Sequence, residues 1–188
     1  MEIMKKMNIE KDLSALIGAV VCATGMNVPI KQDYSGINMS YNFIGDYISF
    51  DATRLLEAKN ELMPSPSLEV YIKTMTLHEL GHGVDRQALL ASLSRTIEIY
   101  TMKKNHSSKE IYNSKQLLSM IIEEHEMNIN FEETAWDNAW HLNQKLQLVA
   151  KHDFEHIKEH SLATYNKNYQ MDLQLYNDLL SQHLLQLA

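Results

Sequence analysis

The chain has 188 residues, 45% apolar and 22% charged, which are the proportions of an ordinary globular protein. Its formal net charge of −7 argues against a nucleic-acid-binding protein, which normally carries a basic surface. The single cysteine, Cys22, excludes an internal disulfide bond and a cysteine-based metal site, and it fits a reducing cytoplasm. No stretch approaches 18 consecutive apolar residues and no signal-peptide pattern is present, so we expect a cytoplasmic protein without a membrane partner.

The pattern of the chain predicts a helical protein with little sheet. Only six glycines and three prolines occur, and because both residues punctuate turns, their scarcity predicts long helices. Apolar spacing predicts a first helix over residues 8–24. Residues 37–50 alternate apolar and polar side chains around Gly45-Asp46, which predicts a β-hairpin. We therefore expect one α+β domain over residues 1–188, predominantly α-helical, with a small β-hairpin or sheet packed on a helical bundle.

Capping residues mark where the later helices should begin. Asp51 precedes one short apolar period, and Ser67 precedes a longer one that continues to about Lys104. Residues 107–110 read Ser-Ser-Lys-Glu, which matches a capping box. Asparagines predict two further breaks, near residues 128–130 and near residues 165–168.

The segment His78-Glu79-Leu80-Gly81-His82 matches the HExxH pattern on a predicted helix. Histidines four residues apart lie one turn apart on one face, so their imidazoles can converge on one metal ion. Two histidines and a carboxylate suit Zn²⁺ and leave a fourth position for water. Glu79 lies about 100° around the helix from His78, where it can reach that water and accept its proton.

Two glycines in the motif helix indicate a close approach. Gly81 and Gly83 each cost about 1 kcal/mol relative to alanine inside a helix. A cost of this kind beside a candidate site indicates that a neighbouring helix or a substrate comes near. The expected core stripe of this helix lies in another sector than the histidines and consists of Val70, Leu77, Leu80, Val84 and Ala88.

A third protein ligand has to come from another part of the chain, and residues 131–140 are the best candidates. Glu132 shares one helix face with alanines at i+3 and i+7, which would let this helix lie close against the motif helix. In the neighbouring register, Glu133 pairs with Asp137 at i+4, which could support a ligating histidine. The two registers compete, and Glu132 is the favoured ligand over Glu133.

These two segments resemble the zincin-type metallopeptidases with a glutamate third ligand, closest to the compact bacterial and phage ImmA/IrrE-like group. The resemblance implies a zincin-like fold and one Zn²⁺ per chain, held by His78, His82 and Glu132, with Glu79 as general base. It implies a zinc-dependent peptidase that acts on a peptide or protein substrate. It also implies an edge strand near residues 42–50 that can pair with an extended peptide.

This sequence departs from the family pattern in two places, and a second function stays open. The gap of 49 residues between His82 and Glu132 is longer than usual, and Trp136 stands where Asp or Asn is common. The alternative function is a metal-binding regulatory or interaction protein on a zincin scaffold, with little proteolytic activity.

Other histidines and one tyrosine are weaker candidates. The C-terminal part of the chain matches the inverted HxxEH motif twice, at residues 152–156 and 156–160. A metal site of that kind also needs a downstream glutamate, and none follows Glu159. A polar helix face is therefore the simpler interpretation. The three histidines of that face are His152, His156 and His160. A structural role is also favoured over proton donation or oxyanion binding for His125, His141 and Tyr165.

Overall fold

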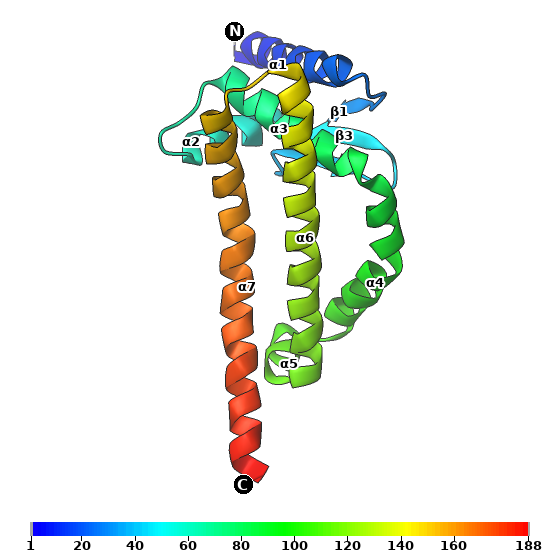
Figure 1. The fold of residues 1–188 in the computed structure, drawn as a ribbon, viewed down its shortest axis with the longest axis vertical. Coiled ribbons are helices and arrows are strands. Elements are labelled where there is room, and N and C mark those ends of the chain that lie inside the picture. Colours follow the sequence, from blue (N-terminus) through cyan, green and yellow to red (C-terminus); the bar gives the residue numbers. More distant parts are fainter. Residues whose placement is uncertain (1, 188) are drawn as a thin grey trace. The chain divides into compact units, whose positions relative to one another are not determined.

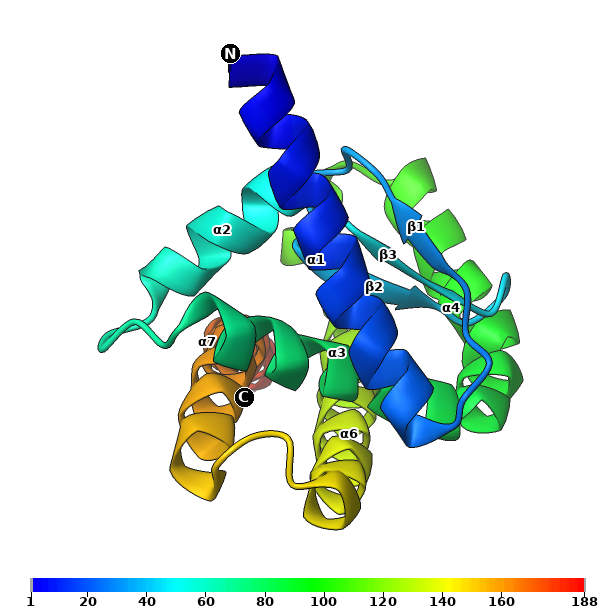
Figure 2. The same cartoon turned by 90° about the horizontal axis from the view of Figure 1, so that it is seen from above.

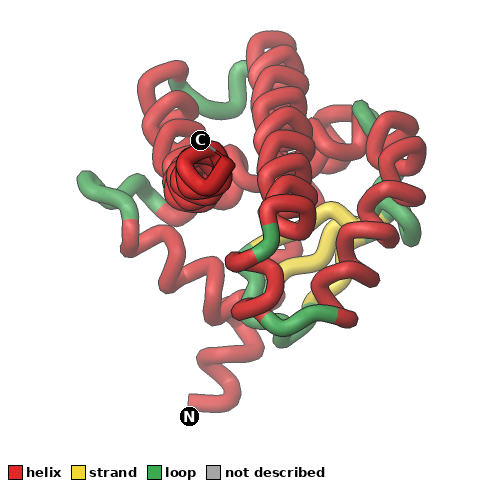
Figure 3. Tube along the Cα trace, turned by 90° about the horizontal axis from the view of Figure 1, so that it is seen from below, coloured by secondary structure: helices red, strands yellow, loops and turns green. Residues whose placement is uncertain are grey.

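The computed structural model describes the backbone of residues 2–187 and the side chains of residues 9–181. The chain is predominantly helical and carries one small three-stranded sheet (Figures 1 and 3), which is the α+β class expected from the sequence. Contacts within the chain define two compact units. The first unit comprises Met1–Arg86 with Thr134–His160, and the second comprises Gln87–Glu133 with Ser161–Ala188. The expectation of a single domain over residues 1–188 stays a prediction.

Within the described residues, the strands all lie in the first part of the chain, between α1 and α2. The elements that begin in the first unit are α1 (Glu2–Thr24), β1 (Ile30–Gln32), β2 (Met39–Asn42), β3 (Tyr47–Phe50), α2 (Ala52–Glu61) and α3 (Leu68–Val84). The remaining elements are α4 (Arg86–Asn105), α5 (Ser108–Asn113), α6 (Lys115–Leu146) and α7 (Lys151–Leu187). The helices α6 and α7 each contribute to both units. None of the helices in the described part of the chain is both long enough and apolar enough to cross a bilayer.

The predicted hairpin is confirmed, and a third strand joins it. The strands β2 and β3 pair antiparallel, with Met39 opposite Phe50 and Asn42 opposite Tyr47. The strand β1 pairs parallel with β3, so the sheet order is β1-β3-β2. The expected edge strand near residues 42–50 is wrong, because Tyr47–Phe50 form the central strand β3 and only Asn42 belongs to an edge strand, β2. The edges of this sheet are β1 and β2.

The core of the first unit surrounds α3. The helix α1 packs against α3 and β1, and α3 packs against β2 (Figure 2). Most of α3 from Tyr71 to Gly81 is therefore buried. The expected core stripe is only partly right, because Leu77 and Leu80 are fully buried whereas Val84 is 54% exposed.

Three predicted capping residues, Asp51, Ser67 and Ser107, begin helices, whereas a helix start at Asn130 is wrong because α6 runs through it. The carboxylate of Asp51 accepts hydrogen bonds from the backbone N–H groups of Thr53 and Arg54, at 3.0 and 3.2 Å. The hydroxyl of Ser67 accepts from the backbone of Val70 at 3.2 Å. The capping box that begins at Ser107 is formed at the start of α5. These caps fix where α2, α3 and α5 begin, and so place the motif in the last two turns of α3.

The predicted helix breaks differ from those in the structure. The helices α6 and α7 run without interruption through residues 128–130 and 165–168. An asparagine costs only about 0.7 kcal/mol inside a helix, which tertiary packing overrides. The long period after Ser67 is instead interrupted at Asp85. There the side chain of Arg86 donates to the carbonyl oxygen of Phe43 at 2.8 Å and so ties the end of α3 to the hairpin.

The second unit has its own apolar core and cross-helix ion pairs. Its buried residues come from α4, α5 and α6, and partly buried residues of α7 pack against them. Arg95 of α4 pairs with Glu123 of α6, and Lys103 of α4 pairs with Glu124 of α6. The fully or nearly fully buried members of this core are Ile99, Met102, Ile111, Leu118 and Ile121.

Candidate metal centre

The HExxH residues lie near the end of α3, buried from His78 to Gly81 and partly buried at His82. His78 and Glu79 are 3% and 4% exposed. The ring centroids of His78 and His82 lie 4.7 Å apart, as expected for imidazoles one helical turn apart. The predicted convergence of the two histidines is therefore present in the structure.

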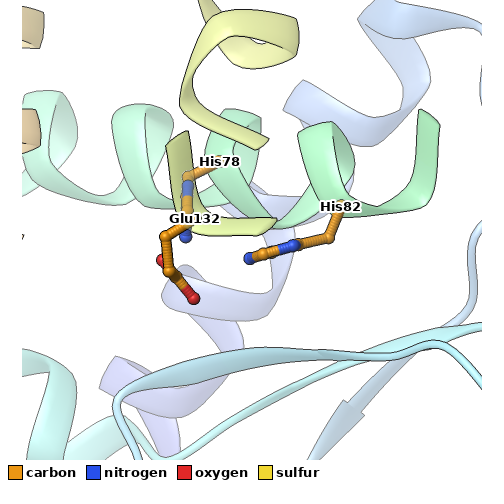
Figure 4. Close-up of side chains that lie close together, drawn as sticks. All are labelled: His78, His82 and Glu132. Carbon is orange, nitrogen blue, oxygen red and sulfur yellow. The ribbon is translucent and has the colours of Figure 1, made fainter. Parts of the chain in front are cut away.

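Glu132 of α6 completes a three-residue group with these histidines. One ring nitrogen each of His78 and His82 and one carboxylate oxygen of Glu132 all lie within 4.8 Å of one another. Figure 4 shows the three side chains pointing toward one another. Ligands of a tetrahedral zinc ion, with bonds of about 2.1 Å, lie about 3.4 Å apart. Small side-chain movements would therefore bring these donors into bonding distance of one ion.

Gly81 explains why α6 comes so close to α3. A Cβ atom at this position would overlap the carbonyl oxygen of Ala135 and lie 3.1 Å from the backbone nitrogen of Ala139. Both alanines are almost fully buried. The side-chain amide of Asn138 donates to the carbonyl oxygen of Gly81, which lies between His78 and His82 in the sequence, at 3.1 Å. The predicted close approach of a neighbouring helix is confirmed.

The same packing determines which glutamate faces the histidines. Glu132 lies one turn before Ala135 on the packed face of α6. Glu133 is turned about 100° away, is exposed and lies outside the three-residue group. Asp137, the expected partner of Glu133 in the competing register, instead pairs with Lys158 at 2.9 Å.

Trp136 fixes the orientation of His78 by packing. Its side chain is fully buried, and its ring stacks on the imidazole of His78 with centroids 4.2 Å apart and planes 23° apart. Trp136 also meets Phe154 of α7 in a T-shaped contact, with ring centroids 5.4 Å apart. Trp136 is therefore a core residue. The sequence does not predict the stacking of Trp136 on His78, because the spacing of residues along one helix does not determine which ring of another helix an indole will contact.

Glu79 is a buried carboxylate on the same turn as His78. Within the described residues it makes no hydrogen bond and no ion pair. A buried charge without a partner is costly, so such a group is expected where a reaction uses it. The nearby Tyr71 was not predicted from the sequence. Burial raises the pKa of Tyr71, although its hydrogen bond with Asn38 acts in the opposite direction.

The other predicted candidates do not join the group. His125 binds the carboxylate of Asp172 at 2.8 Å, and His141 contacts the carbonyl oxygen of Asp137 at 2.8 Å. His156 contacts the carbonyl oxygen of Pro64 at 3.1 Å, and His152 is 82% exposed. Among the described side chains, these histidines belong to no group of three converging metal-ligand donors. Tyr165 is different, because its hydroxyl donates to Glu132 at 3.1 Å.

Comparison with known proteins gives no assignment. The chain matches no protein-family model, no curated protein and no solved structure. The function therefore has to be argued from the residues of the site.

Proposed function

We propose that this protein is a zinc-dependent metallopeptidase that hydrolyses peptide bonds in a peptide or protein substrate. The observation that carries the proposal is the convergence of His78, His82 and Glu132, with the buried Glu79 on the same turn of α3. The order of sheet, motif helix and glutamate-bearing helix along the chain supports a zincin-like fold.

The donor set fits a catalytic zinc ion better than a structural one. Structural zinc sites in proteins are usually closed by four protein ligands, often cysteines, whereas catalytic sites use three and leave a position for water or substrate. Two imidazoles and one carboxylate are such a set, and His78, His82 and Glu132 would hold one ion per chain. The single cysteine, Cys22, lies exposed on α1 and is not part of the group.

The chemistry divides between the metal and Glu79. A bound zinc ion would polarise the scissile carbonyl group and lower the pKa of water. Glu79 would accept a proton from the attacking water and transfer it to the leaving amine. The burial of Glu79 keeps this proton transfer away from bulk water, and no cation among the described residues is paired with its carboxylate. Trp136 would hold the ring of His78 still during the reaction.

The first experiment combines metal analysis with a Glu79→Gln variant. We expect wild type and variant to bind one zinc ion per chain, because Glu79 is not in the ligand group. We expect the variant to lose about 10²–10⁴-fold of its activity, the usual contribution of a general base. Activity is measured by mass spectrometry on a mixed peptide library, with and without a chelator. The matched control is Glu69→Gln, an exposed glutamate on the same helix, which should cleave like wild type.

Two results would contradict the proposal. Full activity of Glu79→Gln would show that Glu79 is not the base. Absence of stoichiometric zinc in the wild-type protein would show that the three side chains are not a zinc site. Stoichiometric zinc without cleavage of any library peptide or candidate protein would instead support the alternative, a metal-binding regulatory or interaction protein.

A further inference from the structure

Tyr165 contacts the carboxylate of Glu132, which completes the three-residue group with His78 and His82. Its hydroxyl lies 3.1 Å from Oε1 of Glu132 and donates a hydrogen bond to it. Tyr165 belongs to α7 and Glu132 to α6, and both residues lie in the second unit. An ionised carboxylate has about four lone-pair sites on its two oxygens, so it can accept this hydrogen bond and also bind a metal ion.

We propose that Tyr165 is a positioning residue that holds Glu132 in the orientation required for zinc binding; this rests on the proposed function. A glutamate side chain has three rotatable bonds, and fixing them on metal binding costs conformational entropy. The ring of Tyr165 is carried by a helix and is itself half-buried, so its hydroxyl offers a fixed anchor. A hydrogen bond made before the metal arrives lowers the entropy lost on binding. Partners of this kind typically contribute about 10–100-fold to metal affinity.

The chain supplies a matched control one turn further along α7. The hydroxyl of Tyr169 donates to Oε1 of Glu126 at 3.0 Å. This bond joins the same two helices through the same pair of residue types. Glu126 is not part of the three-residue group. Removing either hydroxyl therefore deletes the same atom and a similar bond, but only the Tyr165 hydroxyl touches a metal-ligand candidate.

The experiment measures metal binding to the full chain in Tyr165→Phe and Tyr169→Phe. Each variant is titrated with Co²⁺ and with Zn²⁺ in competition with a chromogenic chelator, and the visible absorption of bound Co²⁺ reports the ligand geometry. We expect Tyr165→Phe to weaken affinity by about 10–100-fold and to change the Co²⁺ spectrum. We expect Tyr169→Phe to keep both the wild-type affinity and the wild-type spectrum. Circular dichroism and thermal unfolding verify that both variants are folded.

The outcomes separate this proposal from the proposed function. If the wild-type protein binds zinc and cleaves peptides while Tyr165→Phe keeps the wild-type affinity and spectrum, the positioning role is wrong and the metallopeptidase proposal survives. If both tyrosine variants lose affinity equally, the effect comes from helix packing and the specific role is also wrong. If the wild-type protein binds no metal, both proposals fail, because Tyr165 then has no ligand to orient.

Discussion

A single helical step separates the two glutamates that compete for the third ligand position. Glu132 belongs to the group formed with His78 and His82, and it is the carboxylate that Tyr165 contacts. Glu133 is exposed on the neighbouring face of α6. Consecutive residues of an α-helix differ by about 100° in direction, so one of the two carboxylates faces the histidines and the other faces solvent. The two residues therefore form a matched pair for mutation.

We expect Glu132→Gln to weaken zinc binding by more than about 100-fold, which is the upper end of what an outer partner contributes. The amide keeps the shape of the side chain but removes the negative charge that a zinc ligand supplies. Glu133→Gln removes the same charge one residue away and should bind zinc like wild type. Competition titration of both variants with a chromogenic chelator provides the measurement. Weak zinc binding by Glu133→Gln together with normal zinc binding by Glu132→Gln would mean that Glu133, not Glu132, is the third ligand.

The parts of the site that depend on local spacing were predictable, and the parts that depend on tertiary contacts were not. His78 and His82 share a helix face because they are four residues apart, whatever the rest of the chain does. Glu132 was favoured from the sequence because alanines lie on its face of the helix. The stacking of Trp136 on His78 and the hydrogen bond from Tyr165 each join distant segments, so no short pattern reports them.

At the scale of helices, the close crossing of α3 and α6 brings the three candidate ligands together. Gly81 has no side chain, and the backbone of α6 occupies the space that a Cβ atom would need. Backbone cannot move aside as the end of a flexible side chain can. Gly83, two residues later, differs in this respect, because its Cβ atom would meet the terminal methyl of Met26 at 3.1 Å. The two glycines therefore have different tolerance for alanine.

We expect Gly81→Ala to destabilise the protein by about 1–3 kcal/mol, the usual cost of forcing extra volume into a packed interior. The variant should also bind zinc more weakly, because separating α3 from α6 moves Glu132 away from the histidines. Gly83→Ala should be close to neutral, since the helix propensity gained, about 1 kcal/mol, offsets a small shift of Met26. Urea unfolding and zinc titration of both variants give the measurements. Equal stability of the two would contradict the role given to the Gly81 crossing.

The boundaries of elements show the same division between local and tertiary causes. Asp51, Ser67 and Ser107 act on backbone groups two or three residues away, so the helices they begin could be predicted. The strand β1 has only three residues, which is too short for a recognisable alternation. The expected breaks in α6 and α7 are absent because an asparagine costs too little inside a helix, about 0.7 kcal/mol, to end it.

At the scale of the whole molecule, the protein carries a net charge of −7, and several of its carboxylates are stabilised in their ionised form by the fold. The hydrogen bond from Arg54 lowers the pKa of Glu61, and the hydrogen bond from Arg95 lowers the pKa of Glu123. The backbone N–H of Ser107, followed by its hydroxyl, lowers the pKa of Glu110. A carboxylate with a lowered pKa in the folded state stabilises folding above its unfolded pKa, about 4.5 here, and this contribution disappears as the pH falls through the folded value.

We therefore expect the free energy of unfolding to decrease as the pH falls below about 4.5, where these glutamates become protonated. The experiment is urea unfolding between pH 6 and pH 3 in the presence of a chelator, so that metal release does not contribute. Glu123→Gln should be less stable than wild type at pH 6, because it loses the ionised partner of Arg95. The difference should shrink toward pH 3, where the wild-type carboxylate is neutral as well.

Glu133→Gln is the control for this experiment, because it removes a charge from the same helix and its carboxylate makes no ion pair in the described part of the chain. It should follow the wild-type curve over the whole pH range. A deficit of Glu123→Gln that stays constant from pH 6 to pH 3 would mean that the lowered pKa of Glu123 does not contribute to acid unfolding. In that case the stability lost in the variant comes from packing between α4 and α6 and not from the charge of the Arg95–Glu123 pair.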